Sequence, residues 1–157
     1  MKTQPKPTAT SKSADSQLTL WTIGHSNRSK EAFLELLKEN RIEAIADVRS
    51  FPTSKVEHFR REEMERWLPQ EKVEYVWLGR ELGGYRHSGY KAHMRTKLFR
   101  DGIEKLLETA RAKRTCIMCM ETNPKFCYRR YISTYLEKKK VRVMHIIAKG
   151  QTSLLTF

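Results

Sequence analysis

The sequence predicts a single compact α/β domain with a mainly parallel five-stranded sheet and helices on both faces, a Rossmann-like arrangement. Three observations lead to this prediction. The chain has 157 residues, which suits one domain with a core that needs no disulfides. Strand-like apolar runs alternate with helix-like segments, a pattern that implies right-handed crossovers between parallel strands. Polar and ionisable residues follow the strands at one end, where open α/β sheets bind ligands.

The strands are expected at five short apolar runs that are rich in β-branched and aromatic residues. The first run stops at a glycine, and polar residues bound the others. In chain order the runs are Leu18–Gly24, Ile42–Val48, Val73–Leu78, Thr115–Met120 and Val141–Ile147. Their order within the sheet does not follow from this pattern.

Four helices are expected between these strands. The first covers residues 29–40, where Ser29 can cap the helix and apolar residues recur at helical spacing. A short helix at 61–68 is expected to end before Pro69. A longer helix covers 96–112, and the last covers 124–139 with Pro124 at its first position.

The two ends of the chain differ in composition from the middle. Residues 1–16 contain two prolines, many serines and threonines, and few large apolar side chains, so we expect a disordered basic tail. The α/β domain is expected to cover residues 17–150. Residues 151–157 are expected to form a loose C-terminal tail.

The charge balance favours anionic partners. The chain has 31 Lys and Arg against 18 Asp and Glu, which gives a formal net charge of +13. Such a field attracts nucleotides, phosphorylated metabolites or nucleic acid, although it also aids solubility. No apolar run approaches the roughly 18 residues that cross a bilayer, so no membrane partner is expected. Three cysteines cannot all pair within the chain, which indicates free thiols and a cytoplasmic location.

Candidate site residues are those that follow the expected strands, because the carboxyl ends of parallel strands lie at one edge. The opposite connections are plain charged loops. Candidates for acid, base or nucleophile are Asp47, Glu121, Cys127 and His25. Candidates for ligand binding are Gly24, Ser26, Arg49, Ser54, Gly83, Gly84, Cys119 and Arg129.

Several of these residues also have structural explanations. His25 and Ser26 can cap the first helix, and Asp47 and Arg49 can form a structural ion pair, because they lie two residues apart on one face. The Gly83–Gly84 pair allows either positive φ or close backbone approach, and it matches no phosphate-binding fingerprint.

The cysteines have the spacing C-x2-C-x7-C, which resembles a zinc motif only superficially. Cys116 and Cys119 lie three residues apart on an expected strand, so their side chains should point to opposite faces. No metal and no cofactor is therefore predicted. Cys116 is expected to be a core residue, since unpaired cysteine is among the most buried residue types.

Cys127 is expected near the start of a helix, where the helix dipole and the nearby Arg129 favour an anion. Three roles stay open. The helix start can bind a phosphate with Arg129 as a clamp, Cys127 can be a nucleophilic thiolate, or its thiol can be structural.

Five motifs resemble the family called domain of unknown function 488. They are "TIGHSN", "DVRSFPTS", "LGRELGG", "MCMETNPKFCYRR" and "VMHI", and together they span about residues 20–147. The resemblance implies a compact α/β fold with one site at one sheet edge, and it implies no reaction or substrate. The chain departs from the family pattern at Tyr128, where the family has histidine. If that histidine carries protons, this chain lacks such a carrier or uses His25 instead. If the motif only presents Cys127 and Arg129 at a helix start, tyrosine is harmless there.

Two functions follow as expectations. The first is binding, with processing as a further step, of a phosphorylated or nucleotide-like ligand at the carboxyl edge; whether the protein is an enzyme is left open. The alternative is a non-catalytic nucleic-acid-binding module, based on the net charge and on aromatic residues among basic ones in residues 84–95.

Overall fold

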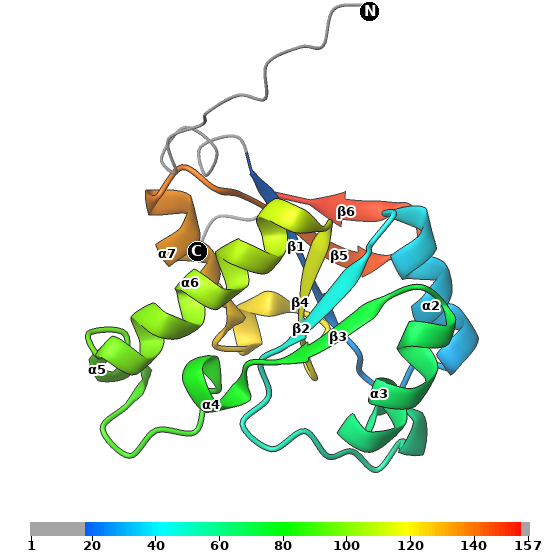
Figure 1. Ribbon diagram of the computed structural model, residues 1–157, viewed down its shortest axis with the longest axis horizontal. Helices are drawn as coiled ribbons and strands as arrows, with labels where there is room; N and C mark the ends of the chain where they lie inside the picture. Colours follow the sequence, from blue (N-terminus) through cyan, green and yellow to red (C-terminus); the bar gives the residue numbers. More distant parts are fainter. Residues whose placement is uncertain (1–17, 155–157) are drawn as a thin grey trace, which may run out of the picture.

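Six strands form one sheet in the order β3-β2-β4-β1-β5-β6 (Figure 1). The structure is a computed structural model, and it describes residues 18–154. The first five strands are parallel to their neighbours, and β6 is antiparallel to β5. The strands are β1 (Thr19–Gly24), β2 (Ala44–Asp47), β3 (Glu74–Trp77), β4 (Thr115–Cys119), β5 (Arg142–Ala148) and β6 (Gln151–Ser153). The predicted α/β fold with a mainly parallel sheet is confirmed.

The strand β6 corrects the predicted end of the domain. Residues Gln151–Ser153 were expected in a loose tail, but they turn back at Gly150 and pair with β5. Gly150 has a φ of 70°, which suits glycine in such a reversal. The expected N-terminal tail at 1–16 and the last residues of the C-terminal tail lie outside the described residues.

The helices cover both faces of the sheet. One face carries α2 (Lys30–Glu39) and α3 (Arg61–Gln70), and the other carries α4 (Gly79–Leu82), α5 (Tyr90–His93), α6 (Lys97–Ala112) and α7 (Arg129–Lys138). Two 3₁₀ turns, η1 (Glu57–Phe59) and η2 (Pro124–Phe126), complete the elements. No helix among residues 18–154 is long and apolar enough to span a membrane.

Alternating strand residues build two separate cores. In β1, Leu20 belongs to the core beneath α6 and α7, whereas Trp21 and Ile23 belong to the core beneath α2 and α3. In β4, Cys116 faces the α2–α3 side and Cys119 faces the other side. The sequence prediction that these two thiols point to opposite faces is therefore confirmed.

The last predicted helix differs from the observed one. Instead of one helix over 124–139, the chain forms η2, becomes extended at Cys127 (φ −136°, ψ 148°), and begins α7 at Arg129. Cys127 thus lies two residues before the helix. The short helices α4 and α5 were not predicted. Pro69 does not end α3 at residue 68 but lies inside its last turn, where its fixed φ is compatible with helix.

Candidate functional site

The carboxyl ends of β1, β2 and β4 meet through backbone hydrogen bonds. The amide of His25 donates to the carbonyl of Cys119 (2.9 Å), and that of Val48 donates to Met118 (3.0 Å). Gly24 makes this approach possible, because a Cβ there would lie 1.8 Å from the carbonyl oxygen of Glu121. The residues that follow these three strands are therefore brought together at one edge.

Asp47 and Arg49 form a buried ion pair. The guanidinium donates from Nε to Oδ1 (2.9 Å) and from Nη2 to Oδ2 (2.7 Å), and the hydroxyl of Tyr75 also donates to Oδ2. Asp47 is fully buried and Arg49 is nearly so. Burial, and then the adjacent Asp47 carboxylate, raise the pKa of Tyr75 above its ordinary value, so the phenol stays protonated.

His25 continues this network. Its Nδ1 donates to the carbonyl of Ser26 (2.8 Å), which leaves Nε2 to accept from Nη1 of Arg49 (3.3 Å). Burial lowers the pKa of His25 to about 4, so the ring is neutral at pH 7. His25 and Asp47 therefore orient Arg49 and do not themselves reach the pocket described below.

Arg129 serves the protein rather than an external anion. Its side chain is fully buried. Nη1 donates to Oγ1 of Thr22 (2.9 Å), and Nη2 donates to the carbonyls of Glu121 and Thr122. Since these contacts use the end of the guanidinium, Arg129 holds the loop between β4 and α7 and is unavailable as the phosphate clamp that the sequence suggested.

Cys119 and Cys127 form a close thiol pair. Their sulfur atoms are 2.6 Å apart, and both cysteines are free. The Cys119 hydrogen bond, and to a smaller extent Arg129, lower the pKa of the Cys127 thiol to about 7. Burial raises the pKa of Cys119 well above its ordinary value, and either sulfur can donate the hydrogen bond that joins them. The amide of Arg129, the first residue of α7, also donates to Sγ of Cys127 (3.5 Å). The start of this helix thus contacts the Cys127 sulfur, where its dipole favours the thiolate form.

A pocket of about 440 Å³ opens over this thiol pair, and we call it the thiol pocket. The segments that follow β2, α4 and β4, together with the loop before α7, form its walls. Its lining includes five residues from the sequence prediction, namely Arg49, Gly84, Cys119, Glu121 and Cys127. Glu121 is exposed there, so its carboxylate is accessible to a ligand.

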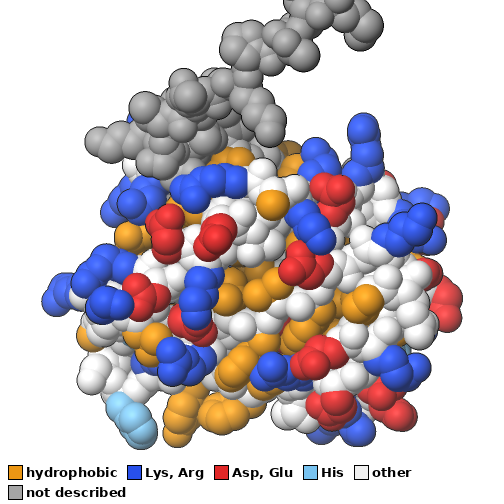
Figure 2. Space-filling model, viewed as in Figure 1, with side chains coloured by type: hydrophobic (Ala, Val, Ile, Leu, Met, Phe, Trp, Pro, Cys, Tyr) orange, Lys and Arg blue, Asp and Glu red, His pale blue; other side chains and the backbone are white. Residues whose placement is uncertain are grey.

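The rim of the thiol pocket is apolar. Five large hydrophobic side chains are exposed in residues 18–154, and four of them line this pocket: Phe51 (65%), Tyr85 (65%), Met120 (55%) and Phe126 (77%). Figure 2 shows hydrophobic side chains protruding at the lower margin of the molecule, beneath α4. Exposed apolar groups gathered in one place mark a binding surface.

The remaining predicted residues lie outside the thiol pocket. Gly24 and Gly83 serve close packing; a Cβ on Gly83 would lie 2.1 Å from Oγ of Ser50. Ser26 donates its amide to the carbonyl of Met120 (2.8 Å), and the hydroxyl of Ser54 accepts from the amide of Val56 (3.0 Å). These residues shape the loops rather than face a ligand.

Tyr128 replaces the histidine of the family pattern in a structural role. Its ring lies against Gly84, whose Cβ, if present, would be 2.2 Å from Cδ1. Its hydroxyl donates to the carbonyl of Val48, and burial raises its pKa above the ordinary value. Tyr128 therefore stays protonated and joins the loop after β2 to the start of α7.

Sequence reasoning missed the apolar rim and Tyr75. Phe51 and Tyr85 stand in loops, and large aromatic residues in loops were the available signal. Phe126 lies in η2, within the segment that the sequence predicted as helix. The contact of Tyr75 with Asp47 joins neighbouring strands (Ala46 pairs with Val76 beside it), so it required the strand order.

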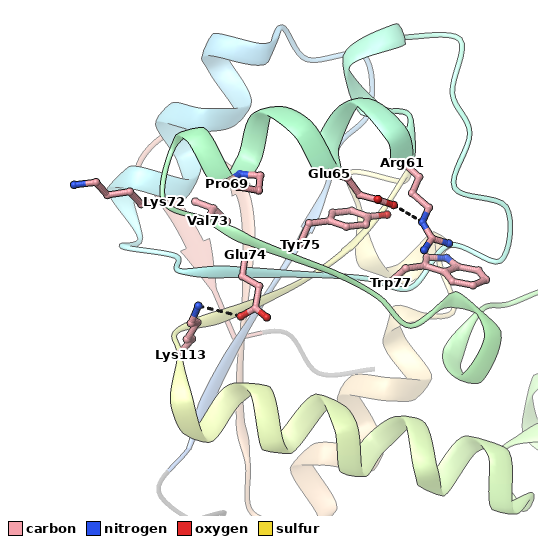
Figure 3. Close-up of a pocket in the computed structure, with 9 residues that line it drawn as sticks. All are labelled: Arg61, Glu65, Pro69, Lys72, Val73, Glu74, Tyr75, Trp77 and Lys113. Atoms are coloured by element: carbon pink, nitrogen blue, oxygen red, sulfur yellow. Dashed lines mark hydrogen bonds and ion pairs between the residues drawn. The ribbon is translucent and has the colours of Figure 1, made fainter.

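One further pocket borders the thiol pocket, and another lies elsewhere on the molecule. The first, of about 340 Å³, shares Phe126, Cys127 and Tyr128 with the thiol pocket and adds Lys125 and Arg130; we call it the cationic pocket. The second, of about 600 Å³, lies beside the sheet-edge strand β3 (Figure 3). There the ion pairs Arg61–Glu65 and Lys113–Glu74 neutralise four of the five charged side chains, which leaves Lys72, and the lining contains no thiol or imidazole. The thiols and the imidazole of His25 therefore lie at the carboxyl edge and not in this pocket.

Comparison with known protein families identifies the family of this chain. A family profile described as "Domain of unknown function DUF488" matches residues 29–136, more than half of the sequence. The chain therefore belongs to the DUF488 family. The matched segment includes Asp47, Arg49, Cys119 and Cys127. Searches of curated proteins and of solved structures gave no match.

Proposed function

We propose that this member of the DUF488 family binds and processes a phosphorylated or nucleotide-like anionic ligand at the carboxyl edge of its sheet. The observation that carries the proposal is the position of Cys127. This thiol lines two adjoining pockets of different character, one apolar and aromatic, the other cationic. A ligand with a planar ring and an anionic group would span both and pass over the sulfur.

The thiol pocket suits the planar part of such a ligand. Phe51 and Tyr85 are in edge contact, with ring centroids 5.3 Å apart, and both rings are largely exposed. Phe126 projects from the loop before α7 and also lines the pocket. Aromatic rings stack on bases at a gain of about 1–3 kcal/mol per base.

The cationic pocket suits the anionic part. Lys125 and Arg130 are exposed, and among residues 18–154 neither forms an ion pair with a carboxylate. Arg49 and Arg129, the cations chosen from the sequence, are engaged with the protein. The proposal therefore moves the anion from those arginines to Lys125 and Arg130.

The reacting groups in this proposal are Cys127 and Glu121. A thiolate with a lowered pKa is a nucleophile near neutral pH, and an exposed carboxylate beside it can move a proton. The free thiols also suit a reducing, cytoplasmic location.

A thermal-shift screen of nucleotides and sugar phosphates tests the proposal. At ligand concentrations about 100-fold above Kd, the wild type should gain ~2.7 kcal/mol of stability, which raises the melting temperature by several degrees. The double variant Lys125→Gln/Arg130→Gln should lose most of this shift. The matched control Lys38→Gln/Arg142→Gln removes two exposed charges at the opposite sheet edge and should keep it. No shift with any anionic ligand, or equal loss in both variants, would refute the proposal.

A second candidate function, nucleic-acid binding, is favoured by a separate observation. A groove of about 600 Å³ between α5 and α7 is lined by Lys91, Arg95, Arg130 and Lys138 around two tyrosines, with no acidic residue. Lys and Arg side chains gather on this side of the molecule, over α5 and α7 (Figure 2). Cations beside aromatic rings fit single-stranded nucleic acid.

Oligonucleotide affinity measured against salt concentration decides this candidate. If the groove tracks phosphates, log affinity falls linearly with log salt, and Lys91→Gln/Arg95→Gln reduces the slope by about 1–2. Unchanged binding in this variant, together with binding only at very low salt, would mean that the net positive charge serves solubility and not nucleic-acid binding.

A further inference from the structure

The two sulfur atoms at the floor of the thiol pocket form a reactive pair that no ligand-binding role requires. Sγ of Cys119 and Sγ of Cys127 are 2.6 Å apart, and both thiols are free. One comes from the end of β4 and the other from the loop before α7. Because the sulfurs are already in contact, forming a bond between them needs only a small adjustment of the two side chains.

The two thiols are not equivalent. Cys127 is the more exposed one, at 9% against 2% for Cys119, and it accepts the amide hydrogen of Arg129 at the start of α7. Cys119 lies deeper, so Cys127 is the thiol that a molecule in the pocket reaches first. The lowered pKa of Cys127 agrees with this assignment. An outer nucleophile with an inner partner thiol is the arrangement that two-electron thiol chemistry requires.

We propose that Cys127 and Cys119 form a dithiol centre that reduces low-molecular-weight anionic disulfides by thiol–disulfide exchange, with Cys127 attacking and Cys119 resolving. The chemistry rests on the sulfur pair and its pocket, and it does not depend on the identity of a nucleotide ligand. The preference for anionic disulfides does rest on the cations of the proposed function, Lys125 and Arg130.

The reaction balances in two steps. The Cys127 thiolate attacks one sulfur of R–S–S–R′, the S–S bond breaks, and R′–S⁻ leaves with the bond's electron pair. Cys119 then gives its proton to solvent or to the departing thiolate and attacks Sγ of Cys127, which expels R–S⁻. One external disulfide is reduced to two thiols, and the two cysteines become one intrachain disulfide. A thiol reductant regenerates the protein through the reverse exchanges.

The pocket walls indicate the substrate class. Phe51, Tyr85 and Phe126 offer apolar and aromatic surface beside the sulfurs, and Lys125 and Arg130 lie on the far side of Cys127. A disulfide that carries carboxylates next to an apolar or aromatic group fits both. A cationic disulfide such as cystamine meets like charge and should react more slowly.

Peptide mapping of the full-length protein tests the sulfur chemistry. Cys116→Ala, which removes a core thiol outside the pocket, is incubated reduced with oxidised glutathione and then digested with trypsin. The digest separates residues 115–125, which contain Cys119, from residues 126–129, which contain Cys127. The expected product is a disulfide that joins these two peptides, with two glutathione thiols released per chain. A persistent glutathione adduct on Cys127, or no reaction there, would overturn the proposal.

Two single variants in the same background separate the roles. In Cys119→Ser the reaction should stop at a stable mixed disulfide on Cys127. In Cys127→Ser the rate of thiol release should fall at least tenfold. If Cys119→Ser still releases two thiols per chain, or if Cys127→Ser reacts at the original rate, the assignment of attacking and resolving thiols is wrong. Melting temperatures confirm that both variants are folded.

The charge preference is measured by comparing the wild type with Lys125→Gln/Arg130→Gln, separately for dithiobis(nitrobenzoate), an aromatic dicarboxylate disulfide, and for cystamine, because the two probes differ in leaving-group acidity. At low salt the double variant should react at least tenfold more slowly than the wild type with the anionic probe, and no more slowly with cystamine. An unchanged rate with the anionic probe in the double variant would overturn the substrate class. The exchange chemistry is measured without any nucleotide, and the thermal shift of the wild type with nucleotides is measured without any disulfide, so failure of the exchange chemistry and failure of the proposed function are distinguishable.

Discussion

Individual residues at the carboxyl edge divide into those that hold the loops and those that only line the thiol pocket. Arg129 and His25 direct their polar groups into the protein, and so does Arg49, although it also lines the pocket. Cys127 and Glu121 line the pocket as well. The charged residues with the strongest sequence signal thus hold the site together, and the less conspicuous thiol and carboxylate form part of its wall.

The buried Arg129 provides the first prediction. Arg129→Ala removes the donors to Thr22 and to the carbonyls of Glu121 and Thr122, and leaves these carbonyls unsatisfied. We expect a loss of ~3 kcal/mol in the free energy of unfolding, measured by urea denaturation. The control is the exposed neighbour, Arg130→Ala, which should change stability by less than ~0.5 kcal/mol. Equal effects in both variants would show that Arg129 is not a structural residue.

The thiol of Cys127 provides a prediction about pH. Only the thiolate is alkylated, so the rate at Cys127 should rise as pH increases through about 7 and then level off. Cys119→Ala removes the hydrogen bond that contributes most to the lowered pKa, so the inflection should move to higher pH. Cys116→Ala should leave it in place. Cys116 itself should react slowest, because it is fully buried and burial raises its pKa. If Cys116 were labelled fastest, the assignment of Cys127 as the accessible thiol would be wrong.

At the scale of elements, the structure depends on close approach between the end of β1 and the loop after β4. The carbonyl of Glu121 lies where a side chain on Gly24 would be, and the same carbonyl accepts from Arg129. The strand end, the loop and the start of α7 are therefore in direct contact, and the two thiols lie on these segments.

Gly24→Ala tests this coupling. The new Cβ would lie 1.8 Å from the Glu121 oxygen, so the loop must shift, and overpacking of this kind costs ~1–3 kcal/mol. We expect that loss in urea denaturation, together with slower formation of the Cys119–Cys127 disulfide under a fixed oxidant. Gly89→Ala is the comparison: nothing lies near its Cβ, and its cost would come from its positive φ alone. Destabilisation without any change in disulfide formation would contradict the coupling.

At the scale of the whole molecule, the apolar rim stands out on a surface that carries a formal net charge of +13. Water-exposed rings contribute little to folding, yet they cost solubility, so their gathering at one pocket points to binding.

Phe51→Ser/Phe126→Ser tests the role of this rim. Both rings are mostly exposed, at 65% and 77%, so the free energy of unfolding should change by less than ~1 kcal/mol. Binding of the dye ANS, and of any ligand found in the nucleotide screen, should fall at least fivefold. Leu154→Ser, an exposed apolar residue outside the thiol pocket, is the control and should leave both unchanged. A large loss of stability in the double variant would mean that the rings serve the fold.

The sequence by itself determined the alternation of strands and helices, because hydrophobic periodicity and turn residues are local properties. Thr19–Gly24 and Thr115–Cys119 were recognisable as strands from β-branched and apolar runs, and the opposite orientation of Cys116 and Cys119 followed from the two-residue period. The gathering of the polar and ionisable residues that follow the strands at one edge of the sheet followed from the parallel arrangement. The strand β6 was missed because three residues carry almost no periodic signal.

Only the tertiary structure decided which of the edge residues are buried in contacts with the protein and which are exposed. Arg129 and Lys125 are both cations near the start of α7, yet one is fully buried and the other is exposed. The difference arises from the carbonyls of Glu121 and Thr122, which no local pattern places beside the guanidinium. The contact of Cys127 with Cys119 likewise depends on the break between η2 and α7, where extended backbone at Cys127 brings the two sulfurs together. Contacts between residues distant in sequence are set by packing and by satisfaction of buried polar groups, and these properties exist only in the folded chain.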